Sequence, residues 1–228
     1  ANAPVSDSGT ADGTDAPADS STDNEADSNT DANGDTSIHV VAVGDNLVQQ
    51  CVYQSAQAHS QDGTSYNFDY CYDNIKPLIN GDLNIINQET LICGDGFEVS
   101  GSNFNFNSPT ELGDAVVGMG FNVITMCNNH LLDKGESGLN SCLNYWDQKM
   151  QQYPDLLTCG VYRDYVDMQN IRTKEFNGKT VAFLSYTENT NGYSLPSNSE
   201  LEIIYTSQED LIQQQIAAAK EIADVVVV

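Results

Sequence analysis

The sequence predicts an α/β fold with a mostly parallel central sheet flanked by helices. Short apolar runs rich in β-branched residues alternate with stretches of helical spacing, which is the pattern of βαβ units. The run at 38–45 is almost continuously β-branched, as expected for a strand buried on both faces, and the apolar runs at 122–126 and 223–228 also predict buried strands. An Asn-Gly dipeptide at 177–178 lies between two strand-like segments and predicts one β-hairpin near 171–186.

Taken in order, the first strand ends at Asp45, and the polar residues 53–68 predict a loop. Residues 68–80 have helical spacing, and Pro77 is expected to kink or end that helix. The next strand is predicted at 83–87.

Glycine turn signals across 92–107 predict a hairpin or a decorated loop. The segment from Ser108 to Glu111 has the composition of a helix start, with a capping serine, a proline at the first helical position and a capping-box glutamate. This helix is expected to end near 118–120. The strand at 122–126 follows it.

The second half of the chain repeats the alternation. Apolar residues three and four apart predict a helix over 136–150, and a strand follows at 156–160. After the hairpin, residues 187–200 form a predicted loop, and Ser207 with Asp210 is expected to cap a helix through Ile222. Because the sequence stops within the apolar run 223–228, we expect further chain beyond it.

Composition divides the chain into two parts. Residues 1–37 contain eight Asp and one Glu, no Lys or Arg, and one large aliphatic residue, so we expect a disordered acidic tether. Residues 38–228 form the predicted α/β domain. This domain retains 33 − 9 = 24 acidic residues against 8 basic ones. Such an acidic balance argues against nucleic acid or an anionic membrane face as partners.

The chain begins at Ala1, so we expect a removed N-terminal signal or lipid anchor and a location at the extracellular face of the membrane. The six cysteines allow 15 full pairings, and none of them forms a Cys-x-x-Cys motif. Cys127 and Cys159 lie at the ends of apolar strands and are expected to be small buried fillers.

Polar side chains follow three of the predicted strands where each strand ends. They are Asp45, Asn87, Glu89, Asn128, Asn129 and His130. Because parallel strands place their carboxyl ends at one edge of a sheet, we expect these side chains to converge there. Carboxylate, amide and imidazole ligands together suit Mn, Fe, Zn or Mg. Two carboxylates from neighbouring strands can hold two cations around an oxyanion.

Each of these residues also has a purely structural interpretation. Asp45 could cap a turn, and Glu89 could be a solvated loop charge. Asn128 and Asn129 could provide turn chemistry, and His130 could be a buried histidine of the core.

The ordered motifs resemble those of the CapA family of bacterial capsule-synthesis proteins, which are associated with poly-γ-glutamate. The family's fold is related to that of the calcineurin-like metallophosphatases. The resemblance covers residues 38–228 and rests on Gly-Asp at 44–45, Asn-Gln-Glu-Thr at 87–90 and Asn-Asn-His-Leu-Leu-Asp-Lys-Gly at 128–135. Further matches are Phe-Asn-Ser-Pro at 106–109 and the run 177–186.

The resemblance implies that Asp45, Glu89 and Asn129 are metal ligands and that His130, with Asn129, is catalytic. Asn87, Asn128 and Asp133 would support them. Gln88 stands where the family usually has an aliphatic residue. The family also has a His-Trp-Gly element and further histidines beyond the position of Val228, so two metals are expected only in a longer protein.

Three functions follow as hypotheses. The first is an extracytoplasmic, membrane-anchored lipoprotein that assists synthesis or export of a capsule polymer such as poly-γ-glutamate. Its partners would be the anionic polymer and the membrane-bound synthesis machinery. The second is a metal-dependent phosphoesterase or related hydrolase acting on a phosphate-containing substrate. The third is an inactive family member.

Overall fold

The computed structural model describes residues 37–102 and 105–228. Apart from Ser37, the acidic tract expected as a tether lies outside the described residues. Four parallel strands form the central sheet, in the order β1-β2-β5-β6, which confirms the predicted fold class. Their bounds are Val40–Asp45 for β1, Leu83–Asn87 for β2, Val123–Thr125 for β5 and Leu157–Cys159 for β6.

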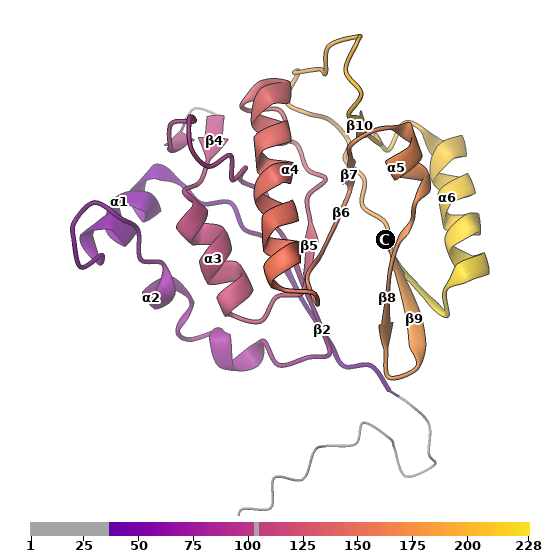
Figure 1. Ribbon diagram of the computed structural model, residues 1–228, viewed down its shortest axis with the longest axis horizontal. Coiled ribbons are helices and arrows are strands. Elements are labelled where there is room, and N and C mark those ends of the chain that lie inside the picture. The colour runs from indigo at the N-terminus through magenta and orange to yellow at the C-terminus, as the bar shows by residue number, and fades with distance from the viewer. Residues whose placement is uncertain (1–36, 103–104) are drawn as a thin grey trace, which may run out of the picture.

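The helices of the described residues alternate with the strands along the chain (Figure 1). They are α1 (Gln50–Ala58), α2 (Asp69–Tyr72), the 3-10 helix η1 (Lys76–Leu78), α3 (Thr110–Gly118), α4 (Gly135–Gln152), α5 (Tyr165–Gln169) and α6 (Glu209–Ile222). Of these, α3 and α4 pack against one face of the central sheet. Val116 of α3 and Trp146 of α4 share a buried cluster with Ile86 of β2 and Ile124 of β5.

A second sheet covers the opposite face. It has the order β11-β9-β8, with bounds Val225–Val227, Lys179–Phe183 and Arg172–Phe176. Alternate residues of the strands point to opposite faces, so Ile85 of β2 and Val123 of β5 meet Val181 and Phe183 of β9. The other face of β9 packs on α6 through Ala219. The layers therefore run helices, central sheet, second sheet, helix, and helices flank both sides (Figure 1).

The predicted hairpin is the antiparallel pair β8–β9. Its turn residues Asn177 and Gly178 have φ values of 50° and 74°, the left-handed conformation that a two-residue hairpin turn requires. Two smaller antiparallel pairs complete the strands. They are β3 (Ser100–Ser102) with β4 (Asn105–Asn107), as the glycines of 92–107 suggested, and β7 (Val161–Tyr162) with β10 (Glu202–Ile203).

Two strands expected to be buried, 38–45 on both faces and 223–228, are edge strands instead. Val40 of β1 is 49% exposed, and Val225 of β11 is 45% exposed. Within the described residues, β1 and β11 each pair with a neighbouring strand on one side only. The prediction of burial on both faces was wrong because an apolar run does not determine a strand's position in the sheet.

Two predictions for the N-terminal part, one of a loop and one of a helix, also differ from the structure. Residues 53–68 are not wholly a loop, because α1 covers the start of this range and buries Tyr53 and Ala56 beside Phe68. The helix expected over 68–80 is broken into the four residues of α2 and the 3-10 turn η1, which contains Pro77. Proline cannot continue the α-helical hydrogen bonding at this point.

Both predicted serine caps are absent. Pro109 occupies the N-cap position of α3, and the hydroxyl of Ser108 instead pairs with Tyr53 and Thr90. Helix α6 begins after Gln208 without a side-chain cap, so Ser207 has no capping role. Tertiary hydrogen bonds took precedence over the local capping pattern at Ser108.

The six cysteines, all within the described residues, are free. Cys127 and Cys159 are buried, as predicted, and so are Cys93 and Cys142. No helix among the described residues combines the length and apolar character needed to cross a bilayer.

Candidate functional site

The strand register places two of the candidate residues, Asp45 and Asn87, side by side at one edge of the central sheet. Asp45 at the end of β1 lies opposite Asn87 at the end of β2, and Asn87 lies opposite Thr125 at the end of β5. The Asn87 amide donates a 2.6 Å hydrogen bond to the Asp45 carboxylate. Thr125 donates to Asn87 in turn, at 3.3 Å. The structure thus brings together side chains up to 80 positions apart in the sequence.

His130 follows β5 and is 3% exposed. Its Nδ1 atom is 2.8 Å from Oδ2 of Asp133, and its Nε2 atom is 3.7 Å from Oε1 of Glu89. The ring packs edge-on against Phe106, with 4.7 Å between the ring centroids. Hydrogen bonding to Asp133 places the Nδ1 hydrogen there and leaves Nε2 directed at Glu89.

Asp133 is a buried carboxylate that holds two elements together. Its Oδ2 atom accepts a 2.7 Å hydrogen bond from the backbone N–H of Phe106 as well as the contact with His130. Its Oδ1 atom is buried without a hydrogen-bond partner among the described residues. Burial raises the pKa of Asp133, although the Phe106 N–H and His130 act in the opposite direction.

Glu89 is buried beside Asp45. Burial raises the pKa of the Glu89 carboxyl, and the neighbouring Asp45 carboxylate raises it further, whereas His130 lowers it. No Lys or Arg of the described residues forms an ion pair with Asp45, Glu89 or Asp133. This edge of the sheet therefore gathers carboxylates that no Lys or Arg of the described residues pairs with, although the more distant charge of Lys134 lowers the pKa of Asp133.

The two asparagines of the turn have different roles. Asn128 donates to the backbone carbonyls of Gln88 and Met126 and accepts from the N–H of His130, so it fixes the turn. The structural interpretation therefore applies to Asn128. Asn129 has an amide that donates to Oδ1 of Asn191, at 3.2 Å, and takes no part in that backbone network.

The chain as a whole is similar to known proteins. The family model described as "Bacterial capsule synthesis protein PGA_cap" matches residues 39–228. The chain belongs to this family. A relative in Bacillus anthracis named "Capsule biosynthesis protein CapA" is 25% identical over 160 residues, which cover 68% of this chain and 38% of the relative. The family resemblance that the sequence motifs suggested is thereby confirmed, and the chain spans less than two fifths of that relative.

The residues of this capsule-synthesis family member are chemically suited to a divalent cation. Asp45 and Glu89 supply carboxylates, Asn129 an amide and His130 an imidazole. The crowded carboxylates without a counter-charge are what a cation would neutralise. In the part of the chain that the structure describes, however, no group of three His, Cys, Asp or Glu side chains is arranged as a metal centre. The ligand roles of these residues remain predictions.

Two polar residues near the edge were not predicted as site residues. Gln88 is buried; its amide donates to Thr90, and its oxygen accepts from Asn46, so it braces the segment that carries Glu89. An aliphatic side chain could not make these bonds. Asn191 reaches the site from the loop 187–200. Its neighbour Gly192 marks a turn, but no local pattern indicated a contact about 60 residues away.

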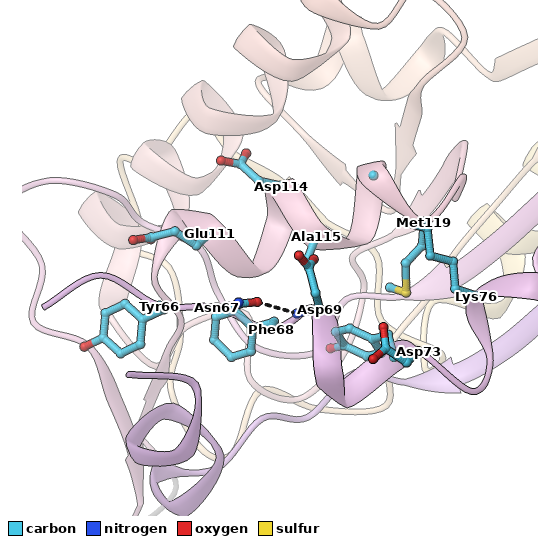
Figure 2. A pocket seen from close by; sticks show the side chains of 12 residues that line it. Tyr66, Asn67, Phe68, Asp69, Asp73, Lys76, Glu111, Asp114, Ala115 and Met119 are labelled. Atoms are coloured by element: carbon cyan, nitrogen blue, oxygen red, sulfur yellow. Dashed lines mark hydrogen bonds between the residues drawn. The ribbon is translucent and has the colours of Figure 1, made fainter. Parts of the chain in front are cut away.

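A separate cavity of about 340 Å³ lies between the α2 segment and α3 (Figure 2). The carboxylates of Asp69 and Asp73 line it from one side, and those of Glu111 and Asp114 line it from α3. None of the candidate site residues contributes to its walls. The strand-edge site and this cavity are therefore distinct places on the protein.

Proposed function

We propose that the chain assists synthesis or export of an anionic capsule polymer such as poly-γ-glutamate, and that it acts through a divalent cation at the strand edge. Membership of the capsule synthesis family supports the biological process. The location at the extracellular face of the membrane and an N-terminal anchor belong to the same proposal, as does association with membrane-bound synthesis machinery.

The observation that carries the proposal is the uncompensated charge around Glu89. Two carboxylates and a buried imidazole face one another without a basic side chain within ion-pair distance. A protein with a formal net charge of −25 would repel a polyanion. A cation held by Asp45, Glu89, Asn129 and His130 would supply the positive charge that the chain itself lacks there.

Cation binding is the first test. Calorimetric titration with Mn²⁺ and Mg²⁺ should show binding to the wild-type chain, and both Asp45→Asn and Glu89→Gln should weaken Mn²⁺ binding by at least about tenfold. Asp147→Asn, which changes an exposed carboxylate on α4, is the matched control for lost negative charge. Wild-type protein that binds no divalent cation, or variants that bind like the control, would overturn the metal role.

Polymer binding is the second test. Poly-γ-glutamate of defined length should be retained by the immobilised chain in Mn²⁺ or Mg²⁺ and released by a chelator. The Glu89→Gln variant should retain none in either condition. Retention that persists unchanged in chelator would show that polymer binding does not depend on the cation.

A second function, a metal-dependent phosphoesterase or related hydrolase, is favoured by one specific observation. The imidazole of His130 is oriented by the buried Asp133 and presents Nε2 to the site, which is the arrangement of a histidine held for proton transfer or for hydrogen bonding to an oxyanion. The cation would supply Lewis-acid stabilisation of a phosphate-containing substrate. Hydrolysis of bis(4-nitrophenyl) phosphate in Mn²⁺ tests this function, with His130→Gln as the inactive variant. Cation binding without hydrolysis would leave the accessory role, and the absence of both would favour an inactive family member.

A further inference from the structure

Among the residues that the structure describes, Asn191 is the member of the loop 187–200 that hydrogen-bonds to the candidate site residues. Its Oδ1 atom accepts the 3.2 Å hydrogen bond from Asn129, and its Nδ2 atom lies 3.4 Å from Nδ1 of His130. Because Nδ1 carries the hydrogen that it donates to Asp133, it cannot also accept a hydrogen bond from the Asn191 amide. The bond to Asn129 is therefore the one through which Asn191 can act.

The loop holds Asn191 in this place by contacts of its own. Thr190 is buried, and its hydroxyl donates to the carbonyl of Tyr193 at 2.7 Å. The backbone N–H of Asn191 donates to the side chain of Asn189 at 3.0 Å. These bonds fix the backbone on both sides of the residue, so the loop conformation determines where the Asn191 amide lies.

The backbone of Asn191 is also in an uncommon conformation. Its φ angle is 53°, and that of Gly192 is 82°. Asparagine is one of the few residues with a side chain that adopts the left-handed region readily, and glycine would adopt the same backbone. The conformation alone therefore accounts for an Asn at this position, as it does at Asn177, and the hydrogen bond to Asn129 is what distinguishes Asn191 from a turn residue.

We infer that Asn191 is a positioning residue that sets the orientation of the Asn129 amide. An amide has one donor end and one acceptor end, and divalent cations bind the oxygen end. With its NH₂ group bonded to Asn191, Asn129 leaves its oxygen as the end available to a cation. This inference rests on the proposed cation site, in which Asn129 is a ligand.

The test compares two asparagines that share the same backbone conformation. Asn191→Gly removes the side chain without backbone strain. Asn177→Gly makes the same change at the β8–β9 turn, where φ is 50°. In calorimetric titration of the 228-residue chain with Mn²⁺, Asn191→Gly should lower the affinity about 10- to 100-fold, as loss of a residue that orients a ligand does. Asn177→Gly should leave the affinity unchanged.

A double-mutant cycle shows whether Asn191 acts through Asn129. In an Asn129→Ala background, Asn191→Gly should cause no further loss of Mn²⁺ affinity, because there is no amide left to orient. Additive losses, or wild-type affinity in Asn191→Gly alone, would overturn the inference.

A metal-free measurement separates this inference from the proposed function. The side-chain NH₂ resonances of Asn129, assigned by their loss in Asn129→Ala, should shift in Asn191→Gly and stay in place in Asn177→Gly. If the wild type binds no Mn²⁺, the proposed function fails while these resonances still report the hydrogen bond. Unshifted Asn129 resonances in Asn191→Gly would show that Asn191 does not position Asn129.

Discussion

Strands β1 and β5 have similar sequences and opposite environments. Both are short runs with β-branched residues, and both end in polar residues at the same edge of the sheet. Strand β5 lies between β2 and β6, and its Val123 and Ile124 are completely buried. Strand β1 is at the edge, and most of its residues are exposed. Neighbours in the sheet, more than composition, decide how much of a strand is buried.

The same difference extends into the candidate site. The part that follows β5 is buried and held by packing, as the contacts of His130 with Asp133 and Phe106 show. The part that ends β1 is exposed, and Asp45 is held by its hydrogen bond to Asn87. Substitutions in the first part should therefore affect folding, and substitutions in the second should affect ligand binding alone.

The largest expected effect on folding is in the centre of β5. Ile124→Ala removes a fully buried side chain and should lower the free energy of unfolding by about 2–5 kcal/mol in urea denaturation. Val43→Ala on β1 is the comparison. Because Val43 is 37% exposed, its loss should cost less than about 1 kcal/mol. Similar costs for the two variants would show that β1 is covered in solution.

The next effect concerns Asp133. Asp133→Ala leaves the Phe106 N–H and the His130 Nδ1–H buried without their acceptor, so stability should fall by about 2 kcal/mol or more. Asp147→Ala, which breaks an exposed ion pair with Arg163, should cost less than about 1 kcal/mol. Thermal unfolding of both variants provides the measurement, and an equal loss would mean that Asp133 is dispensable to the fold.

A smaller effect, of opposite sign, is expected at Glu89. Glu89→Gln keeps the shape of the side chain and removes a buried carboxylate that Asp45 crowds. At neutral pH the melting temperature of the metal-free variant should rise by up to about 2–4 °C, which corresponds to a gain in unfolding free energy of up to about 1 kcal/mol. The variant should also lose Mn²⁺ binding. A lower melting temperature in the absence of metal would show that Glu89 is already satisfied without a cation.

The smallest effect on folding is expected at Asp45. Because this carboxylate is exposed, Asp45→Asn should change stability by less than about 0.5 kcal/mol. Its Mn²⁺ affinity should nevertheless fall by at least about tenfold. Measuring unfolding and Mn²⁺ titration on the same preparation separates the two effects. A large loss of stability would place Asp45 with the buried part of the site.

Sequence patterns with a short range predicted most of the fold. The apolar runs located β2 and β5, and the Asn-Asn-His turn placed His130 and Asp133 three residues apart, where they meet. Helix α1 was missed because only Tyr53 and Ala56 mark its buried face among polar residues. The features that were predicted correctly depend on local spacing alone.

Features that depend on distant contacts could not be predicted. The exposure of β1 is set by the strand order, and the Ser108 hydroxyl serves Tyr53, 55 positions away, in place of its own helix. The contact of Asn191 with Asn129 spans 62 positions and requires a particular loop conformation. No periodicity or motif within one segment encodes such a pairing.

The open edge of β1 has a consequence for how the protein behaves in solution. Its outer backbone groups pair with no strand of the described residues, and Val40 and Val43 lie exposed beside them, which makes the edge a template for pairing with another molecule. The excess of carboxylates keeps molecules apart by electrostatic repulsion at neutral pH. As the pH approaches the sequence pI of about 4.1, or as salt screens the charge, that protection is lost. Colloidal stability of this chain thus depends on charge that protects an exposed β edge, and light scattering across pH and salt should follow its loss.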